Sequence, residues 1–563
     1  MPVPLPRRRL ILQMLSGGLL GAAGLGTAGV ADTVDPRANP RFLHGVASGD
    51  PLPDRVILWT RVTPNDDWHG EIPVDWRIAE DPGMRHLVGS GRLYATESRD
   101  YTLKVDVPNL RPGHIYFYQF QAGAEPSPIG RTKTLPDASV SQVRFAAFSC
   151  SNYPAGYFHV FADAAKRDDL DAVLHLGDYI YEYGKGGYAT QRCVELDRIP
   201  QPLGILMTLQ DYRARYAQYH SDRDLQALHA SVPFITVWDD HEFADDTWSS
   251  GACDHDESKS PFAARRAAAV QAYHEWLPIR MPDATNPDRI YRSFDFGKLV
   301  SLHMLDTRLI GRDRPVNIDE FRDPAGRLNV EAYKAAVADP ARNMIGAEQL
   351  AWLEGQVARS KARWQVLGQQ VLMANMAHPQ SVIDGQLSMP ELQTLRELER
   401  SVPERLSEAD WAYLKADALP WYLDSWDGYA AERERVFDIM RKRGKNLVVL
   451  AGDTHNAWAA DLFDAQNRRV GVEFATASVS SPGLETCYEM APVDIAAMYR
   501  DTVPALRYAE TARRGYIVIT ATQTELTCDY HFVDRTDSRH YTATLGKTLR
   551  TLPGPSHRTV LDT

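Results

Sequence analysis

Four short apolar runs, each followed at once by polar residues, mark the central and C-terminal parts of the chain. They cover residues 143–148, 172–176, 234–238 and 447–450. Apolar runs of this length are typical of strands buried on both faces of a sheet. The amphipathic segment 155–167 lies between the first two runs, so the pattern predicts a β-α-β unit and therefore parallel strands.

Helical spacing of apolar residues recurs in the same part of the chain. We expect helices over residues 209–220, 261–276, 347–358 and 430–443, the last leading directly into the run 447–450. Residues 379–421 contain further helical pieces and are a candidate lid, and residues 515–533 return to strand-like alternation.

The part of the chain from residue 41 to 136 has a different pattern, with short segments in which apolar and polar residues alternate. Strands are predicted over residues 55–62, 74–78, 104–107 and 115–120, and turn signals separate them. Short strands with aromatic alternation predict a β-sandwich. We expect this domain to pack against or position the rest of the chain and to carry no chemistry.

The first 31 residues have the pattern of a twin-arginine signal peptide. Arg8-Arg9 precedes Leu10, and a glycine-rich apolar stretch follows over residues 14–30. An ordinary secretory signal and a membrane anchor are the alternatives; the anchor is disfavoured because the apolar stretch is short and rich in glycine. We therefore expect export by the twin-arginine machinery, to the periplasm or the medium, without a stable membrane anchor.

Length, hydrophobic content and net charge limit the kinds of function that this chain can have. The chain has 563 residues, of which 44% are hydrophobic, enough to build a large core in two domains. Its net charge of -12 comes from 62 basic and 74 acidic residues. This balance argues against a general nucleic-acid-binding surface, which needs basic residues. An anionic substrate would have to be attracted locally, for instance by metal cations.

Five cysteines remain after the signal, so at least one of them is outside any intramolecular disulfide. Cys150 follows a predicted strand and is our candidate for the unpaired one. In an oxidising compartment the other four could form two bridges. We favour Cys193 with Cys253 and Cys487 with Cys528, although sequence leaves the connectivity open.

The residues that follow the apolar runs are those that hold metal ions. Open α/β sheets bind ligands outside the carboxyl ends of their strands, so these residues should converge. Cys150, Asp178, Tyr181 and His455 form a thiolate, carboxylate, phenolate and imidazole set, which suits iron better than zinc or magnesium.

A second set of residues offers oxygen atoms almost alone. Asp178 is shared with the first set, and Asp240, Asp453 and Gln369 complete it, which suits Ca²⁺ and leaves Mn²⁺ open. Two adjacent cations clamp an anion and activate a water, as phosphoryl hydrolysis requires. His241 is free to hydrogen-bond the phosphate or to protonate the leaving oxygen.

Several motifs carry a family resemblance that covers most of the mature chain. They are Ser149-Cys150-Ser151-Asn152, Gly177-Asp178-Tyr179-Ile180-Tyr181, Trp238-Asp239-Asp240-His241-Glu242, Gly452-Asp453-Thr454-His455, Leu305-Asp306-Thr307-Arg308 and the run Trp426 to Arg433. With these motifs and the signal, the chain resembles the PhoD-type alkaline phosphatases and phosphodiesterases of the calcineurin-like metallophosphatase superfamily.

The resemblance implies an α/β fold, with a metallophosphatase β-sandwich and flanking helices over residues 141–540. A small immunoglobulin-like all-β domain over residues 41–136 would precede it, and residues 541–563 would be a C-terminal tail. It also implies a secreted enzyme with Fe³⁺ and Ca²⁺ that attacks phosphate monoesters, and often diesters, through a metal-bridging hydroxide. Asp240 and His241 would act in catalysis, and His241, Asn152 and Arg433 would bind substrate.

Each of these side chains could instead have a purely structural role, without binding metal or substrate. Cys150 and Tyr181 could be core residues, Gln369 could bond to backbone, Asn152 is typical of turns, and Arg433 could lie on a solvated helix face. We expect Arg308 to form an internal ion pair with Asp306, or alternatively to reach phosphate. In this account Glu242 is a partner of the ligands and not a ligand itself.

Two alternative functions stay open. One departure from the family pattern is Asp246, which stands where the resemblance leads us to expect Asn. Its extra negative charge would tighten a calcium or repel a doubly charged phosphate, so a phosphodiesterase or phospholipase D activity on diesters is one alternative. The other is an inactive calcium-binding protein on the same fold.

Overall fold

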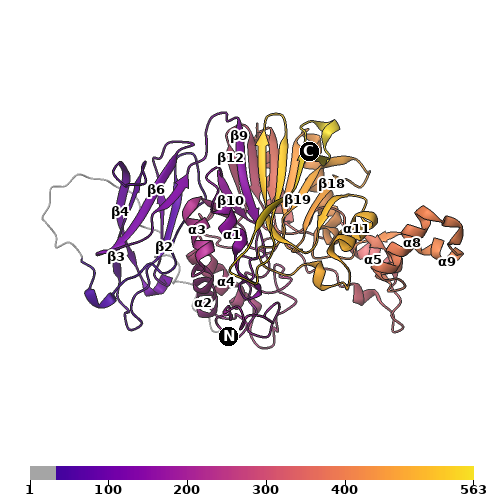
Figure 1. Cartoon of the computed structure of the whole chain (residues 1–563), viewed down its shortest axis with the longest axis horizontal. Coiled ribbons are helices and arrows are strands. Elements are labelled where there is room, and N and C mark those ends of the chain that lie inside the picture. The colour runs from indigo at the N-terminus through magenta and orange to yellow at the C-terminus, as the bar shows by residue number, and fades with distance from the viewer. Residues whose placement is uncertain (1–32) are drawn as a thin grey trace, which may run out of the picture.

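The computed structural model describes residues 33–563, in which two β-sheets pack face to face between outer layers of helices (Figure 1). One sheet has ten strands, in the order β24 (Leu561–Asp562), β23 (Ala543–Thr551), β22 (Leu526–Val533), β21 (Arg514–Thr522), β9 (Gln142–Phe148), β10 (Ala172–His175), β11 (Phe234–Thr236), β1 (Val46–Gly49), β2 (Val56–Arg61) and β5 (Thr102–Val107). The other has seven, in the order β12 (Arg292–Phe296), β13 (Val300–Met304), β14 (Trp364–Gly368), β17 (Asn446–Ala451), β19 (Arg469–Ala475), β18 (Ala457–Phe463) and β20 (Leu506–Glu510).

The central strands are apolar on both faces because each face is covered. In β9, Phe145 points into the core between the two sheets, whereas Phe148 packs under the helices on the outer side. β9, β10 and β11 are parallel neighbours, and β13, β14, β17 and β19 form a parallel set in the second sheet. The parallel strands predicted from the β-α-β pattern are therefore confirmed, within sheets that also contain antiparallel neighbours.

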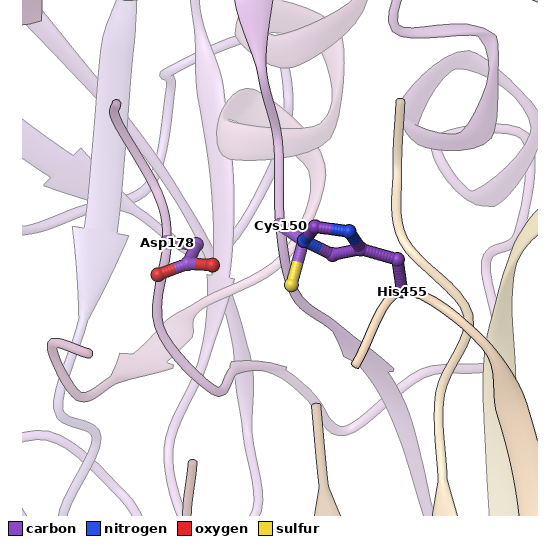
Figure 2. A group of neighbouring side chains, drawn as sticks. All are labelled: Cys150, Asp178 and His455. Carbon is purple, nitrogen blue, oxygen red and sulfur yellow. The ribbon is translucent and has the colours of Figure 1, made fainter. Parts of the chain in front are cut away.

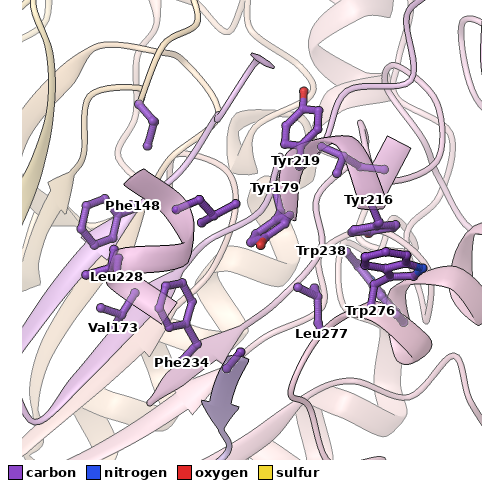
Figure 3. Packing of buried hydrophobic residues seen from close by; sticks show 14 of the residues in the cluster. Phe148, Val173, Tyr179, Tyr216, Tyr219, Leu228, Phe234, Trp238, Trp276 and Leu277 are labelled. Carbon is purple, nitrogen blue, oxygen red and sulfur yellow. The ribbon is translucent and has the colours of Figure 1, made fainter. Parts of the chain in front are cut away.

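Helices from separate parts of the chain form the outer layers. Those over the ten-stranded sheet are α1 (His159–Ala164), α2 (Leu209–His220), α3 (Arg223–Ser231) and α4 (Phe262–Trp276). Those over the seven-stranded sheet include α6 (Gly346–Arg359), α10 (Ala430–Lys442) and α11 (Pro492–Thr502). Figure 3 shows side chains of this layer, among them Tyr216, Tyr219 and Trp276 from the helices and Val173 and Phe234 from the sheet, all members of one buried cluster.

Local sequence explains where these helices begin and end. Thr208 and Asp211 form a reciprocal cap at the start of α2, a device that stabilises a helix by about 1 kcal/mol. The predicted helices at 209–220, 261–276, 347–358 and 430–443 are confirmed to within a residue or so. The prediction at 155–167 is too long, because Tyr153–Ala155 forms a separate 3-10 turn and only His159–Ala164 is α-helical.

The N-terminal domain is the antiparallel sandwich that the alternation predicts. Strands β1, β2 and β5 face a second sheet of β4 (Leu87–Ala95), β3 (Ile72–Ala79), β6 (Ile115–Ala122), β7 (Glu125–Pro126) and β8 (Gly130–Lys133). The domain is joined edge to edge with the rest of the ten-stranded sheet, since Gly49 of β1 pairs in parallel with Phe234 of β11. The sandwich is therefore continuous with the sheet that carries the site.

A helical extension lies at the opposite end of the molecule from β3 and β4 (Figure 1). It contains α5 (Val330–Val337), α7 (Gln380–Ile383), α8 (Met389–Ser401) and α9 (Glu408–Leu414), with a short ribbon of β15 (His378–Pro379) and β16 (Ala418–Leu419). The helical pieces predicted over 379–421 are thus confirmed.

Two expectations need correction. Residues 541–563 are part of the sheet and not a separate tail. Strand β23 pairs with β22 and β24 pairs with β23, and Leu549 and Val560 are buried in the core between the sheets. All five cysteines of the described chain are free, so both predicted disulfides are wrong. Each predicted pair joins a buried cysteine to an exposed one: Cys193 is buried and Cys253 exposed, and Cys528 is buried and Cys487 exposed.

The proposed signal, residues 1–31, lies outside the described residues. Within residues 33–563, the structure contains no helix with the length and apolar character that a membrane crossing requires.

Candidate metal centre

The carboxyl ends of the parallel strands from both sheets meet at one edge of the molecule. The loop after β9 bonds to the loop after β10 through Cys150 N and Gly177 O at 3.2 Å. It also reaches the loop after β19 through a bridge between Ser149 and Ser478. The strand ends therefore converge, as the sequence pattern predicts.

Cys150, Asp178 and His455 form one group at this edge, and Figure 2 shows their side chains gathered from three separate segments. The Sγ, carboxylate and imidazole atoms they offer lie within 4.8 Å of one another. The Tyr181 hydroxyl joins them, donating to Asp178 Oδ2 at 3.0 Å and lying 3.2 Å from His455 Nε2. The structure thus brings together all four residues of the predicted iron set.

Further carboxylates extend from this group to Asp453, which follows β17 of the seven-stranded sheet. Asp178, Asp240 and His241 form a second group of close ligand atoms, and Asp239, Asp240 and Asp453 form a third. Asp178 belongs to the first and second groups, and Asp240 to the second and third. The groups are therefore linked, as expected for two adjacent cations that share one carboxylate.

Four of these residues have backbones in the left-handed region. The φ angles are 61° at Cys150, 55° at Asp178, 63° at Asp453 and 65° at His455. This conformation is costly for residues other than glycine and is found where the surrounding structure enforces it, often at functional sites. Each loop turns sharply just after its strand, which aims successive side chains at the same point.

Glycines allow the loops to approach one another. Gly177 has φ 113°, and a Cβ atom there would lie 2.4 Å from Asp239 Cβ. A Cβ atom on Gly452 would lie 2.4 Å from Ser149 Cβ. Only glycine permits these contacts, so both positions bring the acidic residues beside them into the cluster.

Glu242 fixes two of the loops. Its buried carboxylate accepts the backbone N–H groups of Asp178 at 3.0 Å, Tyr179 at 2.6 Å and Asp239 at 2.8 Å. A single side chain therefore sets the spacing between the loops after β10 and β11. This is the positioning role expected for Glu242.

His241 is held by a carboxylate that the sequence analysis did not identify. Its Nδ1 atom lies 2.9 Å from Glu182 Oε2, and its ring stacks on Tyr181 with centroids 4.2 Å apart. Burial lowers the pKa of His241, but Asp240 and Glu182 outweigh burial and raise it well above the usual range. The imidazole is therefore stabilised in its protonated form.

The cluster carries more negative charge than its protein partners neutralise. Asp178 Oδ1 and Asp240 Oδ1 are buried without a hydrogen-bond partner. Burial raises the pKa values of Asp178 and Asp453 well above the ordinary carboxyl range, and it raises the pKa of the Cys150 thiol. Orphaned buried oxygens beside acids held out of their charged state fit a site built for cations.

Arg308 is a fully buried cation within this cluster. It pairs with Asp239 and with Asp424 at 2.8 Å, and its Nη2 atom lies 3.5 Å from Asp240 Oδ1. The expected ion pair with Asp306 is wrong, since the Asp306 carboxylate accepts backbone N–H groups, including that of Arg308 at 2.8 Å. Burial raises the pKa of Asp240, but the positive charges of Arg308 and His241 lower it by more. The pKa of Asp240 therefore lies below its usual value.

Three predicted site residues lie in other settings. The Gln369 carbonyl accepts Trp426 Nε1 at 3.1 Å, and its amide group donates to a backbone oxygen. Arg433 is held by Asp427 in a buried ion pair at 2.6 Å. Asn152 is fully buried with both amide atoms unpaired.

Two tyrosines that sequence reasoning missed also contact the cluster. Tyr188 places its hydroxyl 3.1 Å from His455 Nδ1, and the Tyr422 hydroxyl donates to Asp453 Oδ2. Both come from long connections between elements, and their spacing from the motifs gives no signal. Tyr188 is exposed and Tyr422 partly buried, so a pattern of buried positions does not mark them either.

The two facing sheets and the buried carboxylate cluster at their common edge define a metallophosphatase. The family model described as "PhoD-like phosphatase" matches residues 145–530, and that described as "PhoD-like phosphatase, N-terminal domain" matches residues 28–136. The chain belongs to the PhoD-like phosphatase family and is a phosphoric ester hydrolase.

Individual relatives agree with this assignment. Alkaline phosphatase D of Bacillus subtilis (strain 168) is 36% identical over an alignment of 485 residues, and the match covers 83% of this chain and 74% of the relative. A solved structure titled "Structure of PhoD" is 31% identical, with a TM-score of 0.77, and the match covers 95% of this chain and 93% of the other.

Proposed function

We propose that the protein is an exported phosphatase that holds Fe³⁺ and Ca²⁺ and hydrolyses phosphate monoesters. The observation that carries this proposal is that Asp178 Oδ1 and Asp240 Oδ1 are buried without a hydrogen-bond partner within linked groups of ligand atoms. Family membership supports the reaction class.

The donor atoms support two unlike ions. Cys150, Tyr181 and His455 with Asp178 offer sulfur, phenol oxygen and nitrogen, a mixed set that suits Fe³⁺. Asp178, Asp240 and Asp453 offer oxygen and suit Ca²⁺, whereas the Gln369 carbonyl already accepts Trp426 Nε1. Bound cations would supply neutralisation of the phosphate charge and a lowered pKa for the attacking water.

His241 is the proposed proton donor. Because Glu182 fixes Nδ1, the proton on Nε2 is the one available to the departing alcohol oxygen. Asp240, the other proposed catalytic residue, favours the protonated imidazole by its charge. The unpaired amide of Asn152 is a candidate partner for phosphate, whereas the ion pair of Arg433 with Asp427 supports a structural role.

Hydrolysis of diesters is a second candidate function, favoured by Asp246. The neighbouring Asp424 carboxylate, followed by burial, raises the pKa of Asp246 to about 8. Asp246 adds to the carboxylates around Asp240, since its backbone N–H donates to Asp240 Oδ2 at 2.7 Å. Above about pH 8 Asp246 is ionised, and its charge would then repel a doubly charged monoester more than a singly charged diester.

Elemental analysis together with hydrolysis of p-nitrophenyl phosphate and bis(p-nitrophenyl) phosphate tests the proposal. We expect iron and calcium in the purified protein, turnover that a calcium chelator abolishes, and a higher rate on the monoester. A higher rate on the diester would select the second candidate. Zinc or manganese without iron would contradict the roles of Cys150 and Tyr181.

A matched pair of histidine variants separates enzyme from inactive binding protein. We expect His241→Ala to lose at least about a hundredfold in kcat, the usual contribution of general acid catalysis. His69→Ala, at an exposed histidine of the N-terminal domain, is the control and should keep full activity. Calcium binding without turnover in the unaltered protein would favour the binding protein.

Export is proposed on the N-terminal sequence alone. Replacing Arg8-Arg9 by Lys-Lys should retain the full-length precursor in the cytoplasm, as cell fractionation would measure. Unchanged export of this variant would point to the general secretory route.

A further inference from the structure

An apolar cavity opens beside the metal centre. Its volume is about 240 Å³, and two of its wall residues, Asp453 and His455, belong to the groups of ligand atoms described above. An engineered apolar cavity of roughly 150 Å³ is large enough to bind benzene. A substituent on a phosphate held at the metal centre would therefore have room for an aromatic ring in this cavity.

The remaining wall of the cavity is mainly aromatic and aliphatic, with Thr454 and Asn456 as its polar members. It includes Trp421, Trp458, Tyr499, Met376 and Leu484. These residues come from connections and elements around the seven-stranded sheet, so the cavity lies on that side of the metal centre.

The polar atoms of these walls are already satisfied within the protein. Trp458 Nε1 donates to Thr454 Oγ1 at 2.9 Å, and Trp421 Nε1 donates to Met376 O at 2.9 Å. The Asn456 carbonyl accepts Leu484 N at 3.1 Å. With these groups engaged, the cavity offers few free hydrogen-bonding groups to a polyol or sugar, and its main contribution to binding is apolar contact.

Trp421 forms a platform at this cavity. One face of its indole stacks on His378, with ring centroids 5.0 Å apart and 14° between the ring planes. The side chain is nevertheless 38% exposed. An apolar aromatic surface that is fixed from behind and open in front is suited to stacking against a flat ligand.

We infer that this cavity holds the organic group of the substrate and selects phosphate esters of aromatic or compact apolar alcohols. The inference rests on the proposed function, because it assumes that the phosphate sits at the metal centre. It names the substrate class that the motifs leave undefined: esters of small polar alcohols gain nothing from these walls, whereas an aromatic ring buries against Trp421 and Leu484.

The test compares kcat/KM for 1-naphthyl phosphate and methyl phosphate on the metal-loaded enzyme. We expect the naphthyl ester to be preferred. Trp421→Ala should reduce that preference about tenfold, mainly through KM, with methyl phosphate changed by less than about twofold. Leu484→Ala should act in the same direction and covers the case in which Trp421→Ala is unstable. Trp411→Ala, at a partly buried tryptophan of α9 outside the cavity, is the control and should leave the preference unchanged.

Equilibrium dialysis with 1-naphthol gives a second readout that needs no turnover. The unaltered protein should bind the alcohol, and Trp421→Ala should bind it several-fold more weakly. Turnover of both esters with a preference that neither cavity variant changes would overturn the inference and leave the proposed function standing. Absence of turnover with either ester would overturn the proposed function, and naphthol binding would then show an apolar site without a catalytic one.

Discussion

Nδ1 of His241 lies 2.9 Å from Oε2 of Glu182, a carboxylate that is fully buried. The same carboxylate accepts the backbone N–H of Asp245 at 2.8 Å through its other oxygen. Glu182 thus fixes both the ring of His241 and the loop that follows it. The ring orientation is set by a residue only one position beyond the Tyr181 motif residue.

Glu182→Gln should lower kcat while leaving KM within a few-fold. The amide preserves the shape and the bond to Asp245, but it removes the negative charge that holds the proton on His241. We expect kcat to fall by about 10- to 100-fold, short of the full contribution of an acid catalyst. Steady-state kinetics measures the effect.

Glu195→Gln is the control for this experiment, because Glu195 is a surface residue paired with Arg192. Equal kcat values for Glu182→Gln and the unaltered protein would show that catalysis does not need the Glu182 charge to hold the proton on His241.

Cys150→Ser should remove iron selectively. A hydroxyl is a far weaker ligand for Fe³⁺ than a thiolate, whereas the oxygen groups around Asp240 and Asp453 are untouched. Elemental analysis should therefore show most of the iron lost and the calcium retained. Cys528→Ser offers a matched control, since Cys528 is also buried and free but lies in β22 within the core. Parallel loss of iron in both variants would indicate a general effect of polar burial.

Gly177→Ala should destabilise the fold more than Gly186→Ala does. Both glycines have positive φ, 113° and 94°, but a Cβ on Gly177 meets Asp239 at 2.4 Å and a Cβ on Gly186 meets nothing within 4 Å. The difference between the two variants in free energy of unfolding therefore reports the steric clash of the added methyl group, which costs about 1–3 kcal/mol. Chemical denaturation of both variants measures it, and equal midpoints would mean that the loop after β10 yields to the added methyl group.

Lys104→Met should flatten the dependence of stability on alkaline pH. Lys104 lies at the junction of the two domains, where its Nζ donates to Ile279 O at 3.1 Å. Burial lowers its pKa from 10.5 to about 7. The unfolded chain then binds more protons than the folded one between pH 7 and 10.5, so this lysine makes stability rise with pH across that window.

Thermal melts from pH 7 to 10.5 compare the two proteins, and the variant should lack that part of the rise. Lys361→Met, at an exposed lysine, should melt with the same pH dependence as the unaltered protein. A Lys104→Met curve that runs parallel to the unaltered one would place the lysine in its ordinary charged state.

The candidate ligands that sequence identifies and the structure brings together include those that directly follow a buried strand. Cys150 and Asp178 were found because an apolar run fixes where each strand ends, and parallel strands end at one edge. Arg308, Asp424 and Tyr422 enter from long connections, where no periodicity relates a residue to its place in space. Their contribution depends on how distant loops pack, which one chain's pattern does not encode.

The disulfide and tail predictions failed for a related reason. The predicted pair of Cys487 and Cys528 does not form, because Cys528 is buried between the sheets as part of a strand whereas Cys487 is exposed. The alternating residues at the end of the chain complete the sheet beside β22. Both outcomes depend on which residues the packed sheets bury.

The pairing of Gly49 with Phe234 has a consequence for how the enzyme could be shortened. Strand β11 has β10 on one side, and its other side is covered by β1 of the N-terminal domain. A catalytic region expressed alone, from residue 141 onward, would present a bare row of backbone donors and acceptors to other chains. The N-terminal domain thus protects the catalytic sheet from self-association, and its removal should reduce solubility before it reduces activity.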